Sequence, residues 1–523
     1  MNEIKHVPLN VNNSSLGNSI DYNSEKFIEK IHAFCLSFNL KPIIVSSSCC
    51  SPEIELFFAS NNFKKLPGFT SLKKDISKSN LLIVSGPIND KFLTILEKAL
   101  NSCEEPKYII VIGDCALQLR DIVPIDLYLP GCPPKPEELY KALKSLQSKI
   151  RKGFLKKRTP EFKPSLESMH DIASFLNFGY LVDQKTEKNI IERIKIQSGF
   201  SHRGLEKALI GKTLSESFEL LSKTDRSASI LGQLLLSKLF AQTFKLDILR
   251  DEEFIEVLYL ELLRISSHLW NLAKLSNALG FNSLYREILK SEESIRIIFE
   301  KVFKKRFSIF MYDKDWLTGP IKNDILQDLS SWIPQLSKVL SLIENKIFSN
   351  YNVKRKLGTL GCITKTQAIN YLLSGPNLRA TGLNIDCRKE MAIYENFGFK
   401  AVLGEAGTAF DRFKIRFDEI VQSRNIISYI AGNLKGTSVS LKNLGMYINK
   451  QINYVDDFIE IESPQGKVGF FITIEKSKIV KFKMVESSSS VTNMLDDFFV
   501  NIPLKYLDLF LVSFDIDVVS MDK

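Results

Sequence analysis

The sequence predicts an α/β domain with a parallel sheet, followed by a larger, mostly helical domain with a small β portion. Short apolar runs rich in β-branched residues predict buried strands at 81–85, 108–112 and 125–129. The segment NDKFLTILEKALNS between the first two runs has helical spacing, which suits the crossover that parallel strands require. From about residue 165 onwards, long amphipathic segments with short connections predict helices instead.

The length and composition indicate more than one domain. The chain has 523 residues, which is more than one hydrophobic core usually organises. We expect a polar tail at 1–23, a first domain at 24–152, a basic linker at 153–164 and a second domain at 165–523. No apolar run approaches the roughly eighteen residues that span a bilayer, so no transmembrane segment is expected. The polar start lacks a secretory signal, which predicts a cytoplasmic protein with reduced cysteines.

Four cysteines lie next to predicted strands of the first domain. Cys49 and Cys50 are adjacent in SSSCCSPEIE after the short strand KPIIV, Cys115 ends YIIVIGDC, and Cys132 lies in LYLPGCPPKP. Ligands bind at the carboxyl ends of parallel strands, and four thiolates are the full ligand set of one tetranuclear cluster. The pattern therefore predicts a 4Fe-4S cluster at that edge of the sheet. Four unrelated core cysteines are the alternative, because cysteine is among the most buried residue types.

Basic residues concentrate where the first domain ends. The formal net charge is +10, and its clearest concentration is KIRKGFLKKRTPEFKP at 149–164. Such a strip is either a solvated, extended linker or a surface facing lipid headgroups or an acidic neighbour. Aromatic and basic residues do not interleave as they do on single-strand-binding surfaces, so nucleic acid is not an expected partner.

The second domain carries strong signals for helices and one for a hairpin. Apolar residues recur every three or four positions at 213–244 and at 251–279, which predicts two core helices. The acidic residues 251–253 favour a helix start, because negative charge stabilises the amino end. The segment IEIESPQGKVGFFITI predicts a hairpin that turns at 464–467.

Polar residues of the second domain form three groups. His202, Arg203 and Glu206 in GFSHRGLEK can orient a partner or tune a redox centre, or can belong to a satisfied buried network. His268 follows Arg264 by four residues on a predicted helix, which favours a structural hydrogen bond. Alternating charges in an otherwise apolar region predict buried arginine–aspartate pairs among Arg379, Arg388, Asp411, Arg412 and Arg416.

The first domain contains a Cys-Cys pair followed by Glu53, then VSGPIND, EEPKYIIVIGDC and PIDLYLPGCPPKPEELYKALKSLQSKI. With these motifs, residues 25–152 closely resemble the small subunit of respiratory complex I, a family that includes small subunits of nickel–iron hydrogenases. The resemblance implies a flavodoxin-like fold and a 4Fe-4S cluster whose ligands are Cys49, Cys50, Cys115 and Cys132. The segment ALQLRDIVPIDLYL is shorter than the family's glycine-rich segment, which affects the expected contact with the large subunit.

Six motifs of the second domain occur in one order: GFSHRGLEK, ELLRISSHLWNLA, YLLSGPNLRATGLNIDCRK, FDRFKIRFDEIVQS, ESPQGKVG and LVSFDIDVVSMDK. In this order they resemble the large subunit of complex I, which is homologous to the hydrogenase large subunit. The resemblance implies a mostly helical, hydrogenase-large-subunit-like fold. It also implies that a small and a large subunit are fused in one polypeptide.

Departures from the family patterns limit which metal site and which quinone-site residues can be expected. Nickel–iron hydrogenases hold their metal with two Cys-x-x-Cys pairs, whereas the corresponding segments DRSASILGQ and DIDVV contain no cysteine, so no nickel site is expected. Complex I large subunits bind quinone through a His-rich loop and a tyrosine. Here His170 is the remaining loop candidate and Ser229 aligns with the tyrosine; serine is a poorer proton donor than a phenol. The candidate quinone-site or cluster-tuning residues are therefore His170, His202, Arg203 and Glu206.

The resemblance implies an electron-transfer module of a complex-I-like NADH:quinone oxidoreductase, active only within its complex. Electrons would pass through one 4Fe-4S cluster to quinone at the junction of the two domains. The implied partners are other peripheral-arm and membrane-arm subunits, and the implied location is the cytoplasmic side of the inner cell membrane. Two alternatives stay open: a nickel-free module of a hydrogenase-type or ferredoxin-using membrane complex, and a non-catalytic scaffold with an eroded quinone site.

Overall fold

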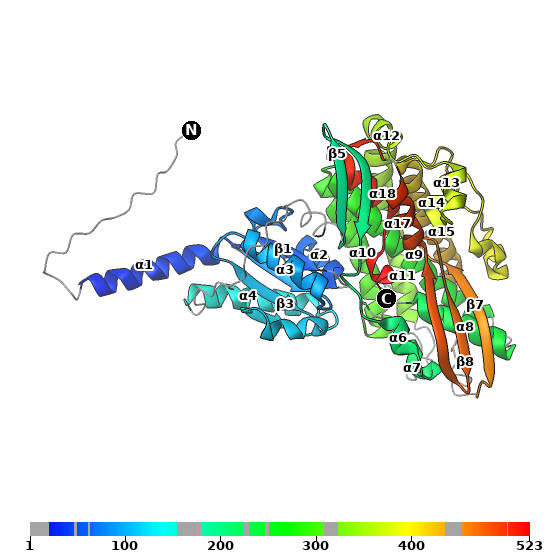
Figure 1. Cartoon of the computed structure of the whole chain (residues 1–523), viewed down its shortest axis with the longest axis horizontal. Helices are drawn as coiled ribbons and strands as arrows, with labels where there is room; N and C mark the ends of the chain where they lie inside the picture. The colour runs from blue at the N-terminus through cyan, green and yellow to red at the C-terminus, as the bar shows by residue number, and fades with distance from the viewer. Residues whose placement is uncertain are drawn as a thin grey trace.

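The chain forms two domains that lie side by side. Figure 1 shows the first domain in blue to cyan and the larger second domain in green to red, with helix α1 (Ile20–Ser37) extending away from both. The computed structural model describes residues 20–46, 50–60, 63–153, 175, 179–222, 230–245, 250–307, 323–434, 451–498 and 500–522. Within these ranges, no helix combines the length and apolar character needed to cross a bilayer.

The first domain is built on a parallel sheet, as predicted. Its strands pair in the order β1 (Pro42–Ser46), β2 (Leu81–Ser85), β3 (Tyr108–Ile112) and β4 (Leu127–Leu129). A flavodoxin-like order would place the first strand between the second and third, and the described strands do not show it. The sheet therefore confirms the α/β class but not this finer topology.

Helices cover both faces of this sheet. Apolar residues of α3 (Asp90–Ser102) pack on one face, and those of α2 (Cys50–Ala59) and α4 (Pro136–Arg151) pack on the other. Helix α3 begins where predicted because the Asn89 side chain caps it, accepting a hydrogen bond from the Phe92 N–H at 2.9 Å. The parallel strands are thus joined by the crossover that the sequence indicated.

Helices dominate the second domain. Helix α9 (Arg250–Ala278) is its centre, since it contacts α10 (Asn282–Phe303), α15 (Ala409–Asn433) and α18 (Leu507–Phe514). The predicted helix at 251–279 is confirmed almost to the residue. The other α-helices in the described part of this domain are α6 (Leu205–Leu209), α7 (Leu214–Leu221), α8 (Leu231–Phe244), α11 (Asn323–Ile343), α12 (Tyr351–Leu357), α13 (Lys365–Asn370), α14 (Gly375–Arg379), α17 (Ser487–Asp497) and α19 (Val518–Met521).

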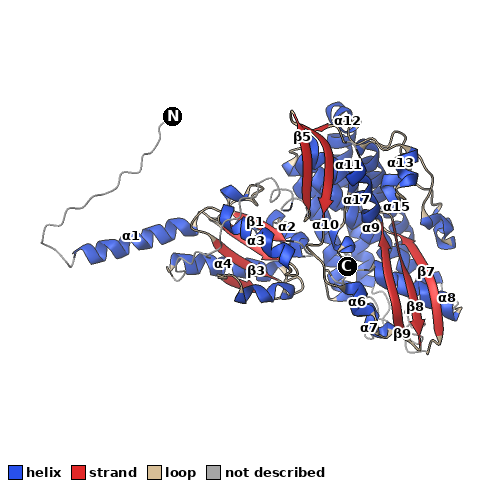
Figure 2. Ribbon diagram, viewed as in Figure 1, coloured by secondary structure: helices blue, strands red, loops and turns tan. Residues whose placement is uncertain are grey.

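Two antiparallel sheets lie at opposite ends of this helical body (Figure 2). One contains β5 (Leu181–Glu187), β6 (Ile190–Gln197) and β10 (Ile502–Pro503), and the other contains β7 (Tyr454–Glu462), β8 (Lys467–Glu475) and β9 (Lys478–Glu486). The predicted hairpin is β7–β8. Its turn needs glycine at 466, where φ is 140° and an added Cβ would lie 2.4 Å from Ser374 Oγ.

A buried arginine links the two domains. Arg306 Nε donates to Glu53 Oε1 of α2 at 2.9 Å, and the same guanidinium lies 2.7 Å from Glu293 and 3.6 Å from Glu300. Burial raises the pKa of Glu53 to about 7, against the opposing effect of Arg306. One guanidinium facing three carboxylates thus holds α2 against α10. A second bridge, Lys135 to Glu300 at 2.6 Å, lies on the surface of the same junction.

We predict that Arg306→Met lowers the free energy of unfolding by about 3–5 kcal/mol, because it leaves a buried carboxylate without its cation. The loss should grow between pH 5 and pH 8. Below about pH 7 Glu53 holds a proton in the fold and needs no cation, and the stability that comes from its raised pKa is lost as the pH rises through about 7. Above that pH the carboxylate is charged and depends on Arg306. Urea denaturation at both pH values measures the loss. Lys135→Met removes the exposed bridge and is the matched control, expected to change little; equal losses in the two variants would contradict the assignment.

Candidate functional site

Three of the four predicted ligand cysteines lie in the described part of the chain, and all follow strands of the parallel sheet. Cys50 begins α2 after β1, Cys115 lies in the short helix after β3, and Cys132 follows β4. Cys49 lies outside the described residues. Within the described residues, which omit Cys49, no three histidine, cysteine or acidic side chains form a group that could hold a metal ion.

Gly113 provides space beside the thiols. An added Cβ there would lie 3.1 Å from Cys50 Sγ, 3.8 Å from Cys115 Sγ and 3.7 Å from the carbonyl oxygen of Gly131. The Gly113 φ of 96° also disfavours any other residue. Two cysteine sulfurs and the loop before Cys132 thus border a space that a side chain would fill. The donor type, the strand-end position and this space fit an iron–sulfur cluster.

Hydrogen bonds join the loops that carry Cys115 and Cys132. The Gly113 N–H donates to Leu129 O at 3.0 Å, and the Gly131 N–H donates to Asp114 Oδ1 at 2.9 Å. Glycine at 131 is required as well, because its φ is 128° and an added Cβ would lie 2.8 Å from the Pro134 backbone. The two loops are therefore fixed relative to each other.

A cavity of about 590 Å³ lies between the two domains. We call it the junction cavity. One wall comes from β1, α2 and the loop 71–74 of the first domain, and the other comes from the end of α9 and the start of α10. Its first-domain wall includes the apolar Ile43, Ile44 and Phe58, and its second-domain wall includes the polar Asn277 and Tyr285. The first-domain wall also includes the charged Glu55, Lys73 and Lys74, so apolar and polar groups both line the cavity.

A smaller cavity of about 40 Å³ adjoins the same region. Pro52 of α2, Trp270 and Lys274 of α9, and Asp515 line it, and Lys274 also lines the junction cavity. Among the described atoms, the buried Trp270 Nε1 and Asp515 Oδ2 have no hydrogen-bond partner. A volume of this size with an unused donor and acceptor suits one buried water molecule.

Of the predicted quinone-site residues, the three that the structure describes, His202, Arg203 and Glu206, do not line the junction cavity. His170 and Ser229 lie outside the described residues. His202 and Arg203 are exposed, and Glu206 accepts hydrogen bonds from Met484 N at 3.0 Å and Lys483 Nζ at 2.9 Å. For Glu206 these contacts match the structural alternative, a satisfied polar network.

Sequence reasoning missed the polar residues that do line the junction cavity. Lys274 and Asn277 are three positions apart near the end of α9, and Asn282 and Tyr285 are three apart at the start of α10. This spacing places each pair on one helix face, which was the available signal. It did not show that α2 of the other domain would face them.

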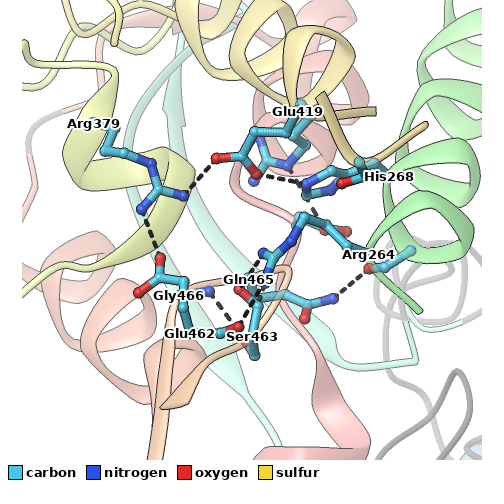
Figure 3. Close-up of polar contacts among 12 residues, drawn as sticks. Arg264, His268, Arg379, Glu419, Glu462, Ser463, Gln465 and Gly466 are labelled. Carbon is cyan, nitrogen blue, oxygen red and sulfur yellow. Dashed lines mark hydrogen bonds and ion pairs between the residues drawn. The ribbon is translucent and has the colours of Figure 1, made fainter. Parts of the chain in front are cut away.

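A fully buried charge network lies on the α9–α15 side of the second domain (Figure 3). Arg379 donates to Glu419 at 2.7 Å and to Glu462 at 2.6 Å, and His268 Nε2 lies 2.9 Å from Glu419. Arg264 donates to the carbonyl oxygens of Glu462 and Ser463, at 2.9 and 3.1 Å. The network thus ties three helices to the β7–β8 turn.

Burial alone would raise the pKa of Glu419, but Arg379 and Arg388 hold it well below its usual range. Burial lowers the pKa of His268, which keeps the ring neutral. The predicted structural role of His268 is thereby supported, although its partner is Glu419 and not the nearby Arg264.

The predicted arginine–aspartate pairing is only partly right. Arg388 donates to Asp386 at 2.7 Å, as an ion pair requires. Asp411, however, caps α15 by accepting from the Thr408 N–H at 2.9 Å. Arg412 donates instead to Ser513 Oγ and backbone carbonyls, and burial together with Arg416 lowers its pKa to about 9. Helix capping decided the role of Asp411, because the residue lies in the first turn.

We predict that Glu419→Gln lowers the free energy of unfolding by about 3–5 kcal/mol, because it leaves two buried guanidinium groups without their shared anion. Thermal unfolding followed by circular dichroism measures the change. Glu395→Gln, a substitution at an exposed carboxylate, is the control and should leave the midpoint in place. A Glu419→Gln midpoint equal to that of the control would show that the network adds no net stability.

Comparison with known proteins supports one of the two resemblances. Residues 279–458 match the family described as respiratory-chain NADH dehydrogenase, 49 Kd subunit. The NADH-ubiquinone oxidoreductase 49 kDa subunit of Dictyostelium discoideum is 24% identical over 356 residues, which cover 62% of this chain and 84% of that protein. The D-type subunit of the NADH-quinone oxidoreductase of Ehrlichia canis is 27% identical over 240 residues, or 46% of this chain and 61% of that protein.

A solved structure shares the fold. It belongs to the membrane-bound sulfane sulfur reductase, an archaeal respiratory membrane complex, with a TM-score of 0.60 and 21% identity. The match covers 66% of this chain and 94% of that chain. The predicted similarity to complex I large subunits is thus confirmed. The fusion with a small subunit, the cluster and the relation to hydrogenases stay predictions.

Proposed function

We propose that this chain is an electron-transfer subunit of a complex-I-like respiratory assembly, and that it delivers electrons through one 4Fe-4S cluster to quinone in the junction cavity. One observation carries this proposal. Helix α2 begins with Cys50, and Ser51, Glu55 and Phe58 of the same helix line the junction cavity. The thiolate site and the cavity therefore lie on one rigid element.

Cys49, Cys50, Cys115 and Cys132 would hold the cluster, which supplies one-electron transfer when bound. The chain's own contribution is to fix the thiolates. The hydrogen bonds between the Cys115 and Cys132 loops set their spacing, and the absence of a side chain at Gly113 leaves room between them. Such fixed loops reduce the rearrangement that metal binding would otherwise require.

The junction cavity suits a quinone headgroup. Its volume of about 590 Å³ lies within the range typical of small-molecule sites. The apolar Ile43, Ile44 and Phe58 can contact the ring, while Asn277, Asn282 and Tyr285 offer hydrogen-bond donors to carbonyl oxygens. Lys274 and Arg286 add positive charge, which stabilises the negative charge that reduction places on quinone oxygens.

The proposed partners are the other peripheral-arm and membrane-arm subunits of the assembly. A peripheral position on the cytoplasmic side of the inner cell membrane is part of the same proposal. The basic segment that begins at Lys149 and Arg151 would then face lipid headgroups or an acidic neighbour. NADH would reduce the assembly through subunits upstream of this chain.

An anionic sulfane-sulfur compound is a second candidate acceptor. The cations lining the junction cavity favour an anionic ligand, and the fold is shared with the sulfane sulfur reductase chain. This candidate belongs with the alternative of a nickel-free module in a ferredoxin-using membrane complex. A non-catalytic scaffold, the remaining alternative, would accept no electrons from the reduced cluster.

We predict that Cys115→Ser and Cys132→Ser each lose most of the bound iron and lower the thermal stability of the chain, because metal binding contributes directly to folding. Iron and acid-labile sulfide per chain, measured after anaerobic purification, test this. Cys35→Ser is the control, since Cys35 is exposed on α1 and fits no ligand spacing. Full iron content in either ligand variant would exclude that cysteine from the ligand set.

For the wild-type chain we predict about four irons, no nickel, and one tetranuclear signal by electron paramagnetic resonance after reduction. Addition of a short-chain quinone should remove the signal by reoxidation. Reoxidation by a sulfane-sulfur compound but not by quinone would favour the second acceptor. If neither compound reoxidises the cluster, the non-catalytic scaffold is favoured. If no cluster forms after reconstitution, the four cysteines do not bind one in this chain.

A further inference from the structure

A tyrosine–carboxylate pair crosses the junction cavity, and neither the cluster site nor the interdomain ion pair uses it. Tyr285 lies in the first turn of α10, and Glu55 lies on α2, the helix that begins at Cys50. The Tyr285 hydroxyl is close enough to the Glu55 carboxylate for its charge to act on the phenol, and Ser51 Oγ donates to Glu55 Oε1 at 3.4 Å. All three side chains line the cavity.

The surroundings keep this phenol protonated. Burial, together with the facing Glu55 carboxylate, raises the pKa of Tyr285 well above its ordinary value. The other charged groups that line the cavity are the cations Lys73, Lys74, Lys274 and Arg286. A neutral donor beside a cationic wall is the arrangement that stabilises an oxygen acquiring negative charge.

The packing of the helices fixes the pair. Helices α2 and α10 are in contact, and Arg306 clamps Glu53 of α2 to Glu293 of α10. Glu55 follows Glu53 by two residues, and Tyr285 precedes Glu293 by about two turns. The phenol is therefore held against the helix that carries Cys50.

We propose that Tyr285 is the hydrogen-bond and proton donor to a quinone carbonyl in the junction cavity, and that Glu55 orients it. The inference rests on the proposed function. Two electrons, passed one at a time through the iron–sulfur centre that the upstream subunits reduce again after the first transfer, and two protons convert both carbonyls to hydroxyls. The Tyr285 O–H bond breaks as an O–H bond forms on one quinone oxygen, and water in the open cavity restores the phenol proton and supplies the second proton. Tyr285 thus takes the place of the phenol missing at Ser229.

The test compares Tyr285→Phe with Tyr371→Phe in the full chain carrying its cluster. Tyr371 is the matched control, because its hydroxyl donates to Asp497 Oδ2 at 3.1 Å on the exposed surface. Binding of a short-chain quinone is followed by tryptophan fluorescence, and reoxidation of the reduced chain is timed with quinone and with ferricyanide. Ferricyanide accepts electrons without protons, so it reports electron delivery alone.

We expect Tyr285→Phe to weaken quinone binding about three- to tenfold, the effect of one hydrogen bond. Quinone reduction should fall about a hundredfold, as for a lost general acid, with ferricyanide reduction unchanged. Tyr371→Phe should match the wild type in all three measurements. Glu55→Gln keeps the size of the side chain, and it should retain quinone binding within about threefold while slowing quinone reduction about tenfold.

Two results would overturn the inference alone: quinone reduction by Tyr285→Phe at the wild-type rate, or an equal loss with ferricyanide, which would show a structural role. If Tyr285→Phe fails to fold, as judged by iron content, Glu55→Gln serves as the test. Quinone reduction by Glu55→Gln at the wild-type rate, or an equal loss with ferricyanide, would then overturn the inference. Failure of the wild type to bind and reduce quinone would overturn the proposed function, and this outcome is visible without any variant.

Discussion

The contact between α2 and α10 is the constraint on which the functional geometry depends. Arg306 neutralises Glu53 and Glu293 across it, so the two buried carboxylates can face one another only while this guanidinium lies between them. Helix α2 then presents Cys50 to the sheet edge and Glu55 to the junction cavity. One buried guanidinium thereby couples the proposed electron carrier to the proposed acceptor site.

A second buried network gives the large domain its rigidity. Glu419 collects Arg379, Arg388 and His268, while Arg264 holds the β7–β8 turn through its carbonyls. Residues in such a network keep little conformational freedom once it forms, and each depends on the others for neutralisation of its charge. The small cavity lined by Trp270 therefore adjoins a part of the molecule whose side chains are fixed by charge pairing as well as by packing.

Prediction from the sequence succeeded where the signal is local. The α9 helix and the β7–β8 hairpin follow from apolar periodicity and turn residues, and both are confirmed. It failed for Asp411, whose carboxylate caps its own helix in preference to pairing with Arg412. It also failed to find Tyr285, because a lone tyrosine on an amphipathic helix has the same local pattern whether it packs in a core or lines a cavity.

The sequence by itself determined the strands, the positions of three cysteines after them, the central helices and the similarity to complex I large subunits, because each depends on residues that are neighbours along the chain. The tertiary structure decided which side chains meet across the junction. Glu53 and Arg306 are separated by 253 positions, and Glu55 and Tyr285 come from different domains. Contacts between such distant segments leave no periodic trace in a single sequence, since they depend on how two finished surfaces pack together.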